Sequence, residues 1–313
     1  KNGIYKATLQ LNGETQLVSA FDKVNFDDTR YINVLVDYPH YIDHKGFVQL
    51  LYKTPGNKLE IYPVLNPNNG YLTIAEGQQY TVTVIVEDFK DNATRINIPI
   101  EGARAELKTP RLEDKGNTEI IASRDNYYEL PNGNVYFPEN TFYENIKISL
   151  SGEGESVQIG DYKTPIHKFY TLSIKNTKYK DDEVSRVYIS RGGSFEPTVY
   201  KDGFFTERVR GLGRFSLRKD ETPPVVKALN FKNKGSVKAD VLKLSVSDNL
   251  SGFSHCSATL NGQWILFEYE PKNHTLKFNF ADITPSDSNS YDLEVKAFDK
   301  AGNIGTLKAT FTR

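Results

Sequence analysis

Strict alternation of apolar and polar residues is the feature of this sequence that most narrows its fold. Within residues 80–88, YTVTVIVED, the side chains of Tyr80, Val82, Val84 and Val86 share one face. A period of two with β-branched residues is typical of a strand. The same pattern predicts strands at 145–152, 169–175, 241–248 and 291–299. Helical periodicity is weak, and only a short turn at 39–44, with Pro39 at its start, is expected to be helical. We predict an all-β protein.

Asn-Gly pairs punctuate these segments. They stand at Asn12-Gly13, Asn69-Gly70, Asn132-Gly133 and Asn261-Gly262. Both residue types tolerate the positive φ angles that tight hairpins require. We therefore expect antiparallel strands joined by short turns.

Two parts of the chain repeat each other. Tyr80, Asp88 and Asn92 have the same spacing as Tyr291, Asp299 and Asn303, and residues 3–13 (GIYKATLQLNG) echo 252–262 (GFSHCSATLNG) with a small shift. A repeated spacing indicates a repeated structural unit. Residues 1–101 and 223–313 are thus predicted to be two copies of one sandwich module.

The repeat divides the chain into three predicted β-sandwich domains. These are an immunoglobulin-like sandwich at 1–103, a different middle sandwich at 104–220, and a C-terminal immunoglobulin-like sandwich at 221–313. The polar stretch 104–119 and the charged, proline-containing stretch 219–224 are the expected boundaries. In the third domain a predicted strand, within residues 239–252, leads up to Gly252. The counterpart of Gly252 in the first domain is Gly3, which stands almost at the first residue. We expect the first copy to lack its opening strand or strands and the chain to begin inside a domain of a longer polypeptide.

Composition excludes several classes of function. With 39 basic and 40 acidic residues the net charge is −1, so the chain lacks the excess of positive charge that is typical of proteins that bind nucleic acid. No apolar run reaches the 18 or more residues of a spanning helix. Cys256 is the only cysteine and can form neither an intramolecular disulfide nor a cysteine-based metal site.

Five stretches carry a family resemblance. They are DDTRYINVLVDY (27–38), TPGNKLEIY (54–62), NVYFPENTFYE (134–144), TPIHKFYTLSI (164–174) and LNGQWILFEYE (260–270). In this order they resemble the β-rich C-terminal half of large lysostaphin-type zinc metallopeptidases of Bacteroidetes. The resemblance implies immunoglobulin-like domains behind a zinc peptidase domain, and a location in the periplasm, at the outer membrane or on the cell surface.

The catalytic motif of that family is absent from these residues. It requires a His-x3-Asp pair and a His-x-His pair to hold zinc and activate water. No Asp stands four residues after His40, His44, His167, His255 or His274, and no two histidines are two apart. We therefore predict no catalytic, cofactor-binding or metal-binding residue in this chain, and expect zinc only in a peptidase domain upstream.

Two local groups resemble metal sites. His40 and His44 would share one face of a helical turn, as in zinc peptidases, but the segment is short and offers no third ligand, so we favour two solvated histidines in an exposed loop. The turns Asp88–Asn92 and Asp299–Asn303 offer hard oxygen ligands for calcium. An Asx turn that needs no ion accounts for them too, and we favour that interpretation.

Two other groups resemble an anion site and a nucleophile. Arg208, Arg210 and Arg214 flank a Gly-x-Gly turn, but strand rather than helix follows, so we expect the arginines to pair with acidic neighbours. His255 and Cys256 are adjacent and should point to opposite faces of a strand, with the cysteine buried.

The segment 251–270 contains the only tryptophan and is predicted to be a hairpin that turns at Asn261-Gly262. Either Trp264 and Leu266 or the alternate pair, Ile265 and Phe267, should enter the core.

These observations predict a non-catalytic, extracytoplasmic scaffold that docks on a protein partner in an envelope or outer-membrane complex. A peptidoglycan- or glycan-binding module is the first alternative. The second is that the chain is part of an active peptidoglycan zinc endopeptidase whose catalytic domain lies upstream. No nucleic acid partner and no transmembrane segment are expected.

Overall fold

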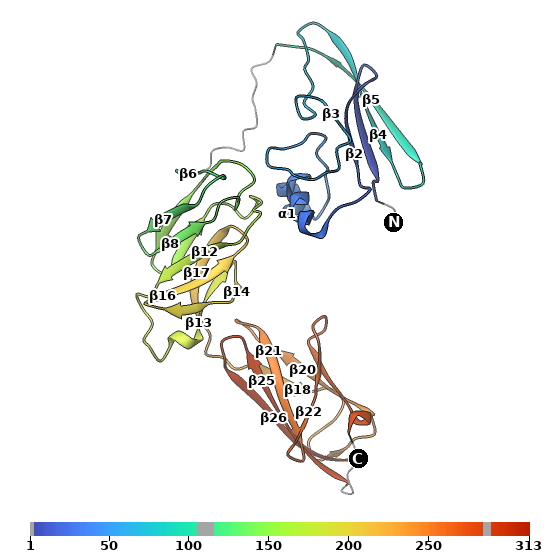
Figure 1. Ribbon diagram of the computed structural model, residues 1–313. Helices are drawn as coiled ribbons and strands as arrows, with labels where there is room; N and C mark the ends of the chain where they lie inside the picture. The colour runs from blue at the N-terminus through green and yellow to red at the C-terminus, as the bar shows by residue number, and fades with distance from the viewer. Residues whose placement is uncertain (1–2, 105–115, 284–288) are drawn as a thin grey trace.

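The computed structural model describes residues 3–104, 116–283 and 289–313, and these are built almost wholly from antiparallel strands (Figure 1). The all-β fold class and the tandem β-sandwich architecture are thereby confirmed. Each sheet takes its strands from one part of the chain, and we call residues 1–103, 104–220 and 221–313 the first, middle and third regions. The domain boundaries at these positions stay a prediction, and most of the proposed linker, 105–115, lies outside the described residues.

The first region contains one five-stranded sheet of order β3-β2-β1-β4-β5. Its strands are β1 (Lys6–Leu11), β2 (Glu14–Ala20), β3 (Val64–Leu65), β4 (Gln79–Glu87) and β5 (Ala93–Glu101). The long segment between β2 and β4 carries the 3-10 helix η1 (Phe26–Val34) and the helix α1 (Tyr38–His44). The carboxylate of Asp37 caps α1 by accepting the N–H of His40 at 2.9 Å, and Pro39 occupies the first turn, as predicted.

The segment between β2 and β4 covers only part of the sheet. Leu9, Leu17 and Val82 pack with the half-buried Leu51 and Leu72 of this segment. A second small cluster, formed by Leu35, Leu59 and Ile61, lies beside it. The outer strand β5 is exposed over nearly its whole length.

The middle region is a sandwich of two five-stranded sheets, with a two-stranded ribbon beside them. One sheet has the order β15-β16-β12-β8-β7: β15 (Val199–Lys201), β16 (Phe204–Val209), β12 (Tyr170–Lys175), β8 (Gly133–Phe137) and β7 (Asn126–Leu130). The other has the order β10-β11-β17-β13-β14: β10 (Leu150–Glu153), β11 (Ser156–Ile159), β17 (Gly213–Lys219), β13 (Val187–Arg191) and β14 (Ser194–Glu196). The ribbon pairs β6 (Thr118–Ile120) with β9 (Ile146–Ile148), and a short 3-10 helix, η2 (Val184–Arg186), precedes β13.

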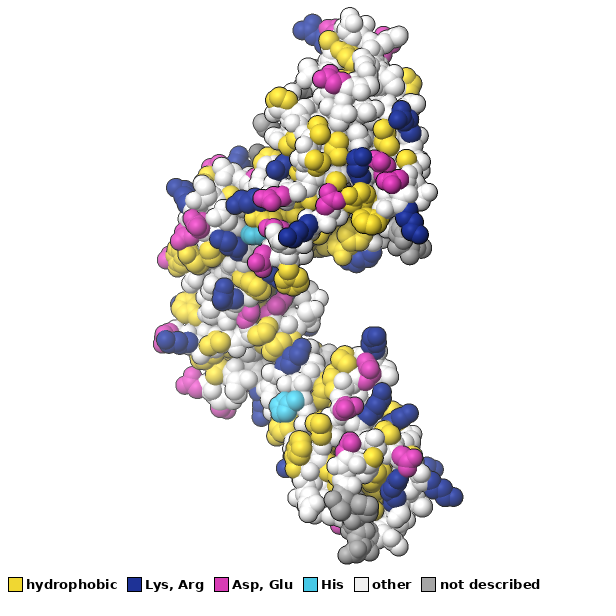
Figure 2. All heavy atoms as spheres, turned by 45° about the vertical axis from the view of Figure 1, so that its right-hand side comes forward, with side chains coloured by type: hydrophobic (Ala, Val, Ile, Leu, Met, Phe, Trp, Pro, Cys, Tyr) yellow, Lys and Arg dark blue, Asp and Glu magenta, His cyan; other side chains and the backbone are white. Residues whose placement is uncertain are grey.

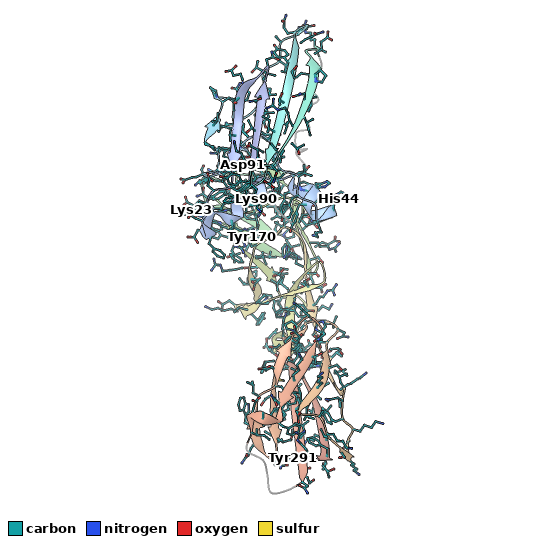
Figure 3. The ribbon with its side chains drawn as sticks, turned by 90° about the vertical axis from the view of Figure 1, so that its right-hand side faces the viewer. Lys23, His44, Lys90, Asp91, Tyr170 and Tyr291 are labelled. Atoms are coloured by element: carbon teal, nitrogen blue, oxygen red, sulfur yellow. The ribbon has the colours of Figure 1, made fainter. Side chains whose placement is uncertain are left out.

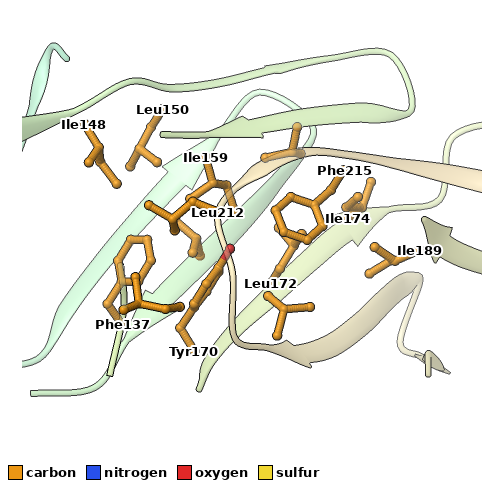
Figure 4. Packing of buried hydrophobic residues seen from close by; sticks show 14 of the residues in the cluster. Phe137, Ile148, Leu150, Ile159, Tyr170, Leu172, Ile174, Ile189, Leu212 and Phe215 are labelled. Carbon is orange, nitrogen blue, oxygen red and sulfur yellow. The ribbon is translucent and has the colours of Figure 1, made fainter. Parts of the chain in front are cut away.

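The core of the middle region is aromatic at its centre. Tyr170 is fully buried between Phe137 and Leu172, and its hydroxyl points to the chain near Leu212 (Figure 4). That hydroxyl donates a hydrogen bond of 2.9 Å to the carbonyl of Gly211. A buried phenol needs such a partner, and its burial raises the pKa of Tyr170 well above the usual value.

The third region is a sandwich with a four-stranded and a five-stranded sheet. The first has the order β18-β20-β24-β23: β18 (Val225–Ala228), β20 (Val241–Ser247), β24 (Thr275–Asn279) and β23 (Glu268–Glu270). The second has the order β19-β26-β25-β21-β22: β19 (Gly235–Ser236), β26 (Ile304–Thr312), β25 (Ser290–Asp299), β21 (Phe253–Leu260) and β22 (Gln263–Ile265). Only β19 and β26 pair in parallel among the described strands, and the 3-10 helix η3 (Phe280–Asp282) follows β24.

Two predicted local features differ from the structure. The predicted strand 145–152 is two strands, β9 and β10, because the chain changes partner at Ser149 from β6 to β11.

The predicted turn at Asn132-Gly133 lies one residue earlier, and neither residue has a positive φ. Gly133 already belongs to β8, where an added Cβ would lie 2.1 Å from the carbonyl oxygen of Ser173, so close packing explains this glycine. The other three Asn-Gly pairs have the predicted positive φ at both residues.

Candidate functional site: an open apolar face

The repeated modules have matching sheets. In the first region β1, β4 and β5 pair in the order in which β21, β25 and β26 pair in the third. Tyr80 lies opposite Ile100, as Tyr291 lies opposite Phe311. The turns match as well. The carboxamide of Asn12 accepts the N–H of Thr81 at 2.7 Å, and that of Asn261 accepts the N–H of Asp292 at 2.7 Å.

The matched faces differ in burial. In the third region Val295, Ala297 and Phe311 are buried beneath the sheet that contains β20 and β24. The corresponding face of the first region runs over three strands and is formed by Ala7, Leu9, Leu11, Val82, Val84, Val86, Ile96, Ile98 and Ile100. We call its uncovered part the open face, defined as Val84, Val86, Ile96 and Ile98. Ile96 is 53% exposed and Ile98 44% exposed, and the two valines are half-buried.

The open face belongs to a strand whose edge is protected. β5 forms the outer edge of the first region in Figure 1. Pro99 interrupts the row of backbone donors along β5, and proline in a strand is typical of an edge that does not accept another strand. Arg95 and Asn97 lie on the opposite, polar face of β5. The geometry therefore favours a ligand that packs on the face over one that extends the sheet.

Side-chain contacts couple the first region to the middle region. Arg30 of η1 donates a hydrogen bond of 2.8 Å to the carbonyl of Ile166, and the hydroxyl of Tyr143 donates one of 2.5 Å to the carbonyl of Arg30. Asp43 forms an ion pair of 2.7 Å with Lys163. His167 stacks on Tyr31 with 4.6 Å between ring centroids.

Burial and charge shift two pKa values at this junction. The pKa of His167 is lowered, first by burial and then by the nearby Arg30, Lys168, Lys58 and Arg210. Burial raises the pKa of Tyr143 to about 12. The junction is thus a packed contact in which the histidine is favoured in its neutral form.

The two histidines of α1 stack on each other. The ring centroids of His40 and His44 are 4.4 Å apart. Among the described residues, the one group of three metal-ligating side chains consists of Asp220, Asp248 and Asp299 and includes neither histidine. The zinc ligands that the lysostaphin resemblance implies therefore do not fit the described part of this chain, and we derive no zinc chemistry from it.

The two predicted Asx turns are present. The carboxylate of Asp88 accepts the backbone N–H of Asn92 at 3.1 Å and its side-chain N–H at 2.9 Å. These hydrogen bonds lower the pKa of Asp88, the bond from the Asn92 side chain most. Asp299 accepts the same two groups of Asn303, both at 2.8 Å. Figure 3 shows Lys90 and Asp91 at the lower end of the first region, where this turn lies.

The arginine cluster differs from its prediction. Arg208 and Arg210 lie over the ring of Phe169, at 5.8 and 4.4 Å from its centroid. Arg214 donates to the hydroxyl of Ser156 at 3.4 Å. The ion pairs found among the described residues include none of these three arginines, and cation–π contacts with Phe169 take the place of the expected acidic partners for Arg208 and Arg210.

The adjacent His255 and Cys256 point to opposite faces of β21. His255 is exposed and stacks on Phe298, with ring centroids 4.5 Å apart. Cys256 packs against the core of the third region, and this burial raises the pKa of its thiol. In the same hairpin Ile265 and Phe267 enter the core, whereas Trp264 is 68% exposed. The alternate pair is thus the buried one.

Sequence reasoning missed the residues of the open face on β5. The alternation of Ile96, Ile98 and Ile100 in residues 93–101 was the available signal for an apolar face. It could not show that the face is uncovered. Sequence reasoning also missed Asp220 and Asp248, which come from separate stretches of chain.

The surface contains mixed charges. On the face drawn in Figure 2, Lys and Arg side chains are interspersed with Asp and Glu, and hydrophobic side chains gather on the lower part of the first region. No helix among the described residues is long and apolar enough to cross a membrane.

Several solved structures have distant likeness to the chain. Fibronectin(III)-like modules of CbhA from Clostridium thermocellum match with 15% identity and a TM-score of 0.23, covering 45% of this chain and 84% of that one. Bacteroides ovatus SGBP-B, from a mixed-linkage glucan utilization locus and solved with a heptasaccharide, matches with 13% identity and a TM-score of 0.18. The match covers 98% of this chain, which spans 60% of that protein. A 1.5-MDa bacterial ice-binding adhesin matches with 8% identity and a TM-score of 0.20, covering 100% of this chain and 86% of that one.

None of the curated proteins matches the sequence significantly. One segment has a family match of its own: residues 118–220, the described body of the middle region, match the family model of the Zu5-like domain.

Proposed function

We propose that this chain is a non-catalytic, extracytoplasmic interaction scaffold, and that it docks a protein partner of the cell envelope on the open face. The single observation that carries the proposal is the exposure of Ile96 and Ile98 on a face whose counterpart in the third region is buried. The opening strands that the first copy is expected to lack would cover the same face, so strands of the same polypeptide are the occupant against which the experiment tests the partner. Contiguous exposed apolar side chains on a folded domain are typical of an interaction site.

The third region supports the choice of a β-strand partner. There the matched face is covered by β20 and β24, whose inward residues Leu242, Leu244 and Leu276 are fully buried. A partner that fits the open face is therefore a protein that lays β-strands with alternating apolar residues across β4 and β5. Pro99 opposes addition at the edge, so the contact is a second layer of a sandwich.

The packed junction supports the scaffold role. Arg30, Tyr143 and the Asp43–Lys163 pair hold the first region against the middle region. A docking face on such a body is presented at a fixed distance from the middle region, and that arrangement suits a scaffold more than a flexible tether.

Photo-crosslinking tests the proposal in the native host. A photo-reactive residue is placed at Ile98, on the open face, and in a matched control at Asn97, its neighbour on the polar face of β5. We expect Ile98 to yield a crosslinked species heavier than the protein and Asn97 to yield none. The crosslinked peptide should contain alternating apolar residues, and a reactive residue placed there should crosslink back to β4 or β5.

Three results would overturn the proposal. They are equal crosslinking from Ile98 and Asn97, crosslinks from Ile98 that stay within the same polypeptide, and no crosslink from Ile98. The second result would indicate that strands of the same polypeptide cover the face. Ile96→Lys, introduced into the chain that carries the photo-reactive residue at Ile98, should remove the crosslink while leaving folding unchanged, because the side chain of Ile96 is largely exposed.

Glycan or peptidoglycan binding is the second candidate, and one observation favours it. Beside α1, the rings of Tyr41 and Phe47 lie 4.9 Å apart at 36°, and Phe47 is 72% exposed. Exposed aromatic faces can stack on sugar rings. Sedimentation of the chain with purified sacculi, lost in Phe47→Ala and retained in I96K/I98K, would support this candidate.

The link to a lysostaphin-type peptidase is part of the proposal. Five ordered stretches of sequence support it, and the zinc would then be held in a peptidase domain outside these residues. Sequencing upstream of Lys1 in the gene tests this link. A region without the His-x3-Asp and His-x-His pairs would contradict an active parent enzyme.

A further inference from the structure

Three aspartates meet where the middle and third regions join. One carboxylate oxygen from each of Asp220, Asp248 and Asp299 lies within 4.8 Å of the other two. Asp220 follows the last strand of the middle region, Asp248 follows β20, and Asp299 ends β25. Asp220 and Asp299 are buried and Asp248 is half-buried. Separate stretches of chain thus bring three acidic groups to one point.

Backbone donors fix the orientation of these carboxylates. Asp220 accepts the N–H of Thr222 at 3.0 Å and that of Ser251 at 2.9 Å. One oxygen of Asp248, Oδ2, accepts the N–H groups of Leu250 and Gly252. Its other oxygen, Oδ1, is buried and has no hydrogen-bond partner among the described residues. The site therefore has a preoriented but unused oxygen ligand.

Two buried hydroxyl groups beside the cluster are also unpartnered. Ser251, whose N–H binds Asp220, is 1% exposed, and its Oγ has no hydrogen-bond partner among the described residues. The hydroxyl of Tyr188, 2% exposed, has none either. Tyr188 lies on the outer face of β13, away from the core residues Val187 and Ile189. Burial raises its pKa most, and the charges of the three aspartates raise it further. Buried polar groups without partners are rare unless an ion or water satisfies them.

The negative charge of the cluster also needs a partner. None of the ion pairs found among the described residues involves Asp220, Asp248 or Asp299. The nearby Lys300 lies instead over the ring of Phe195, at 5.2 Å from its centroid. Three close carboxylates repel one another unless a cation joins them.

We propose that Asp220, Asp248 and Asp299 bind a calcium ion that locks the third region to the middle region. Calcium takes six to eight oxygen ligands in flexible geometry, and here carboxylates, hydroxyl groups and water can supply them. Asn303 reinforces the junction, because its side-chain N–H group donates one hydrogen bond of 2.9 Å to the carbonyl of Asp220 and another of 2.8 Å to the carboxylate of Asp299.

The first region provides an internal control. Asp88 and Asn92 form the same Asx turn as Asp299 and Asn303, with the same hydrogen bonds. Among the described residues no second and third carboxylate join Asp88 to make a ligand group. The turn alone therefore does not make the site, and Asp88 should not bind calcium.

The experiment titrates calcium chloride into the EDTA-treated chain by calorimetry and measures its thermal unfolding. We expect one calcium per chain and, with calcium at about 100 times the dissociation constant, a rise of roughly 5 °C or more in the melting temperature. Asp248→Asn should lose at least tenfold in affinity, whereas Asp88→Asn should bind like the parent chain. In EDTA, Asp248→Asn should melt at or above the parent temperature, because one repulsive charge is gone.

Four outcomes would overturn the proposal. They are no heat and no melting shift at 10 mM calcium chloride, unchanged affinity in Asp248→Asn, an equal loss in Asp88→Asn, and magnesium chloride binding as tightly as calcium chloride. The titration of the parent chain alone is decisive even if a variant misfolds.

Discussion

The first and third regions use the same strands to build surfaces of opposite character. β4 and β5 pair in the register of β25 and β26, and their hairpins close with the same Asp and Asn hydrogen bonds. Yet Val295 is fully buried and its counterpart Val84 only half-buried. The comparison teaches that alternation defines an apolar face, whereas a second layer of chain decides whether that face is a core.

The largest expected difference comes from the matched valines. Val295→Ala should lower the free energy of unfolding of the third region by about 2–3 kcal/mol, because it removes buried methyl groups and leaves a cavity. Val84→Ala should cost about 1 kcal/mol or less, since its side chain is partly in solvent. Urea denaturation, monitored with one spectroscopic probe in the first region and one in the third, measures both losses of free energy. Equal losses would show that the first face is covered in solution.

The matched asparagines of the two hairpins should differ less. Asn303→Ala removes buried hydrogen bonds to Asp299 and to the carbonyl of Asp220, and we expect it to cost about 1–3 kcal/mol. Asn92→Ala removes an exposed bond to Asp88 and should cost about 0.5 kcal/mol. Both are read from chemical denaturation in EDTA. A cost for Asn92→Ala as large as for Asn303→Ala would contradict the assigned difference in burial.

The smallest effect concerns pH at the junction of the first and middle regions. The folded pKa of His167 lies below its unfolded value of about 6.5, chiefly through burial. Its stabilising contribution is therefore complete above that unfolded value and is lost as the pH falls through the folded pKa. The backbone amide of His167 donates to the carbonyl of Thr141. As the pH falls from the unfolded to the folded pKa, its hydrogen exchange should become faster than the pH dependence of exchange in an unstructured peptide predicts. His167→Gln should abolish the excess, and an unchanged profile in that variant would disprove the role of His167.

Local pattern was sufficient for the strands and the repeat. The alternation at 80–88 and 291–299 corresponds to β4 and β25, and three Asn-Gly pairs form the predicted turns. It was insufficient at 145–152, where one apolar run serves two sheets because the chain changes partner at Ser149. Hydrogen-bond partners across a sheet are long-range choices, and a local period of two does not encode them.

The candidate sites show the same limit. Residues 264–267 alternate, so either Trp264 and Leu266 or Ile265 and Phe267 could enter the core, and packing chose the second pair. Asp299 was visible in sequence as a turn residue, but its approach to Asp220 and Asp248 was not, because Asp220 follows β17, Asp248 follows β20 and Asp299 ends β25, far apart in the sequence.

The sequence by itself determined that this chain is all-β, that its first and third regions repeat one module, and that it has no lysostaphin-type zinc motif. Those properties depend on residue period and spacing, which are local. Only the tertiary structure decided that the face of Ile96 and Ile98 is open and that three aspartates converge. Burial and convergence depend on which distant segment packs against a surface, and no local pattern contains that information.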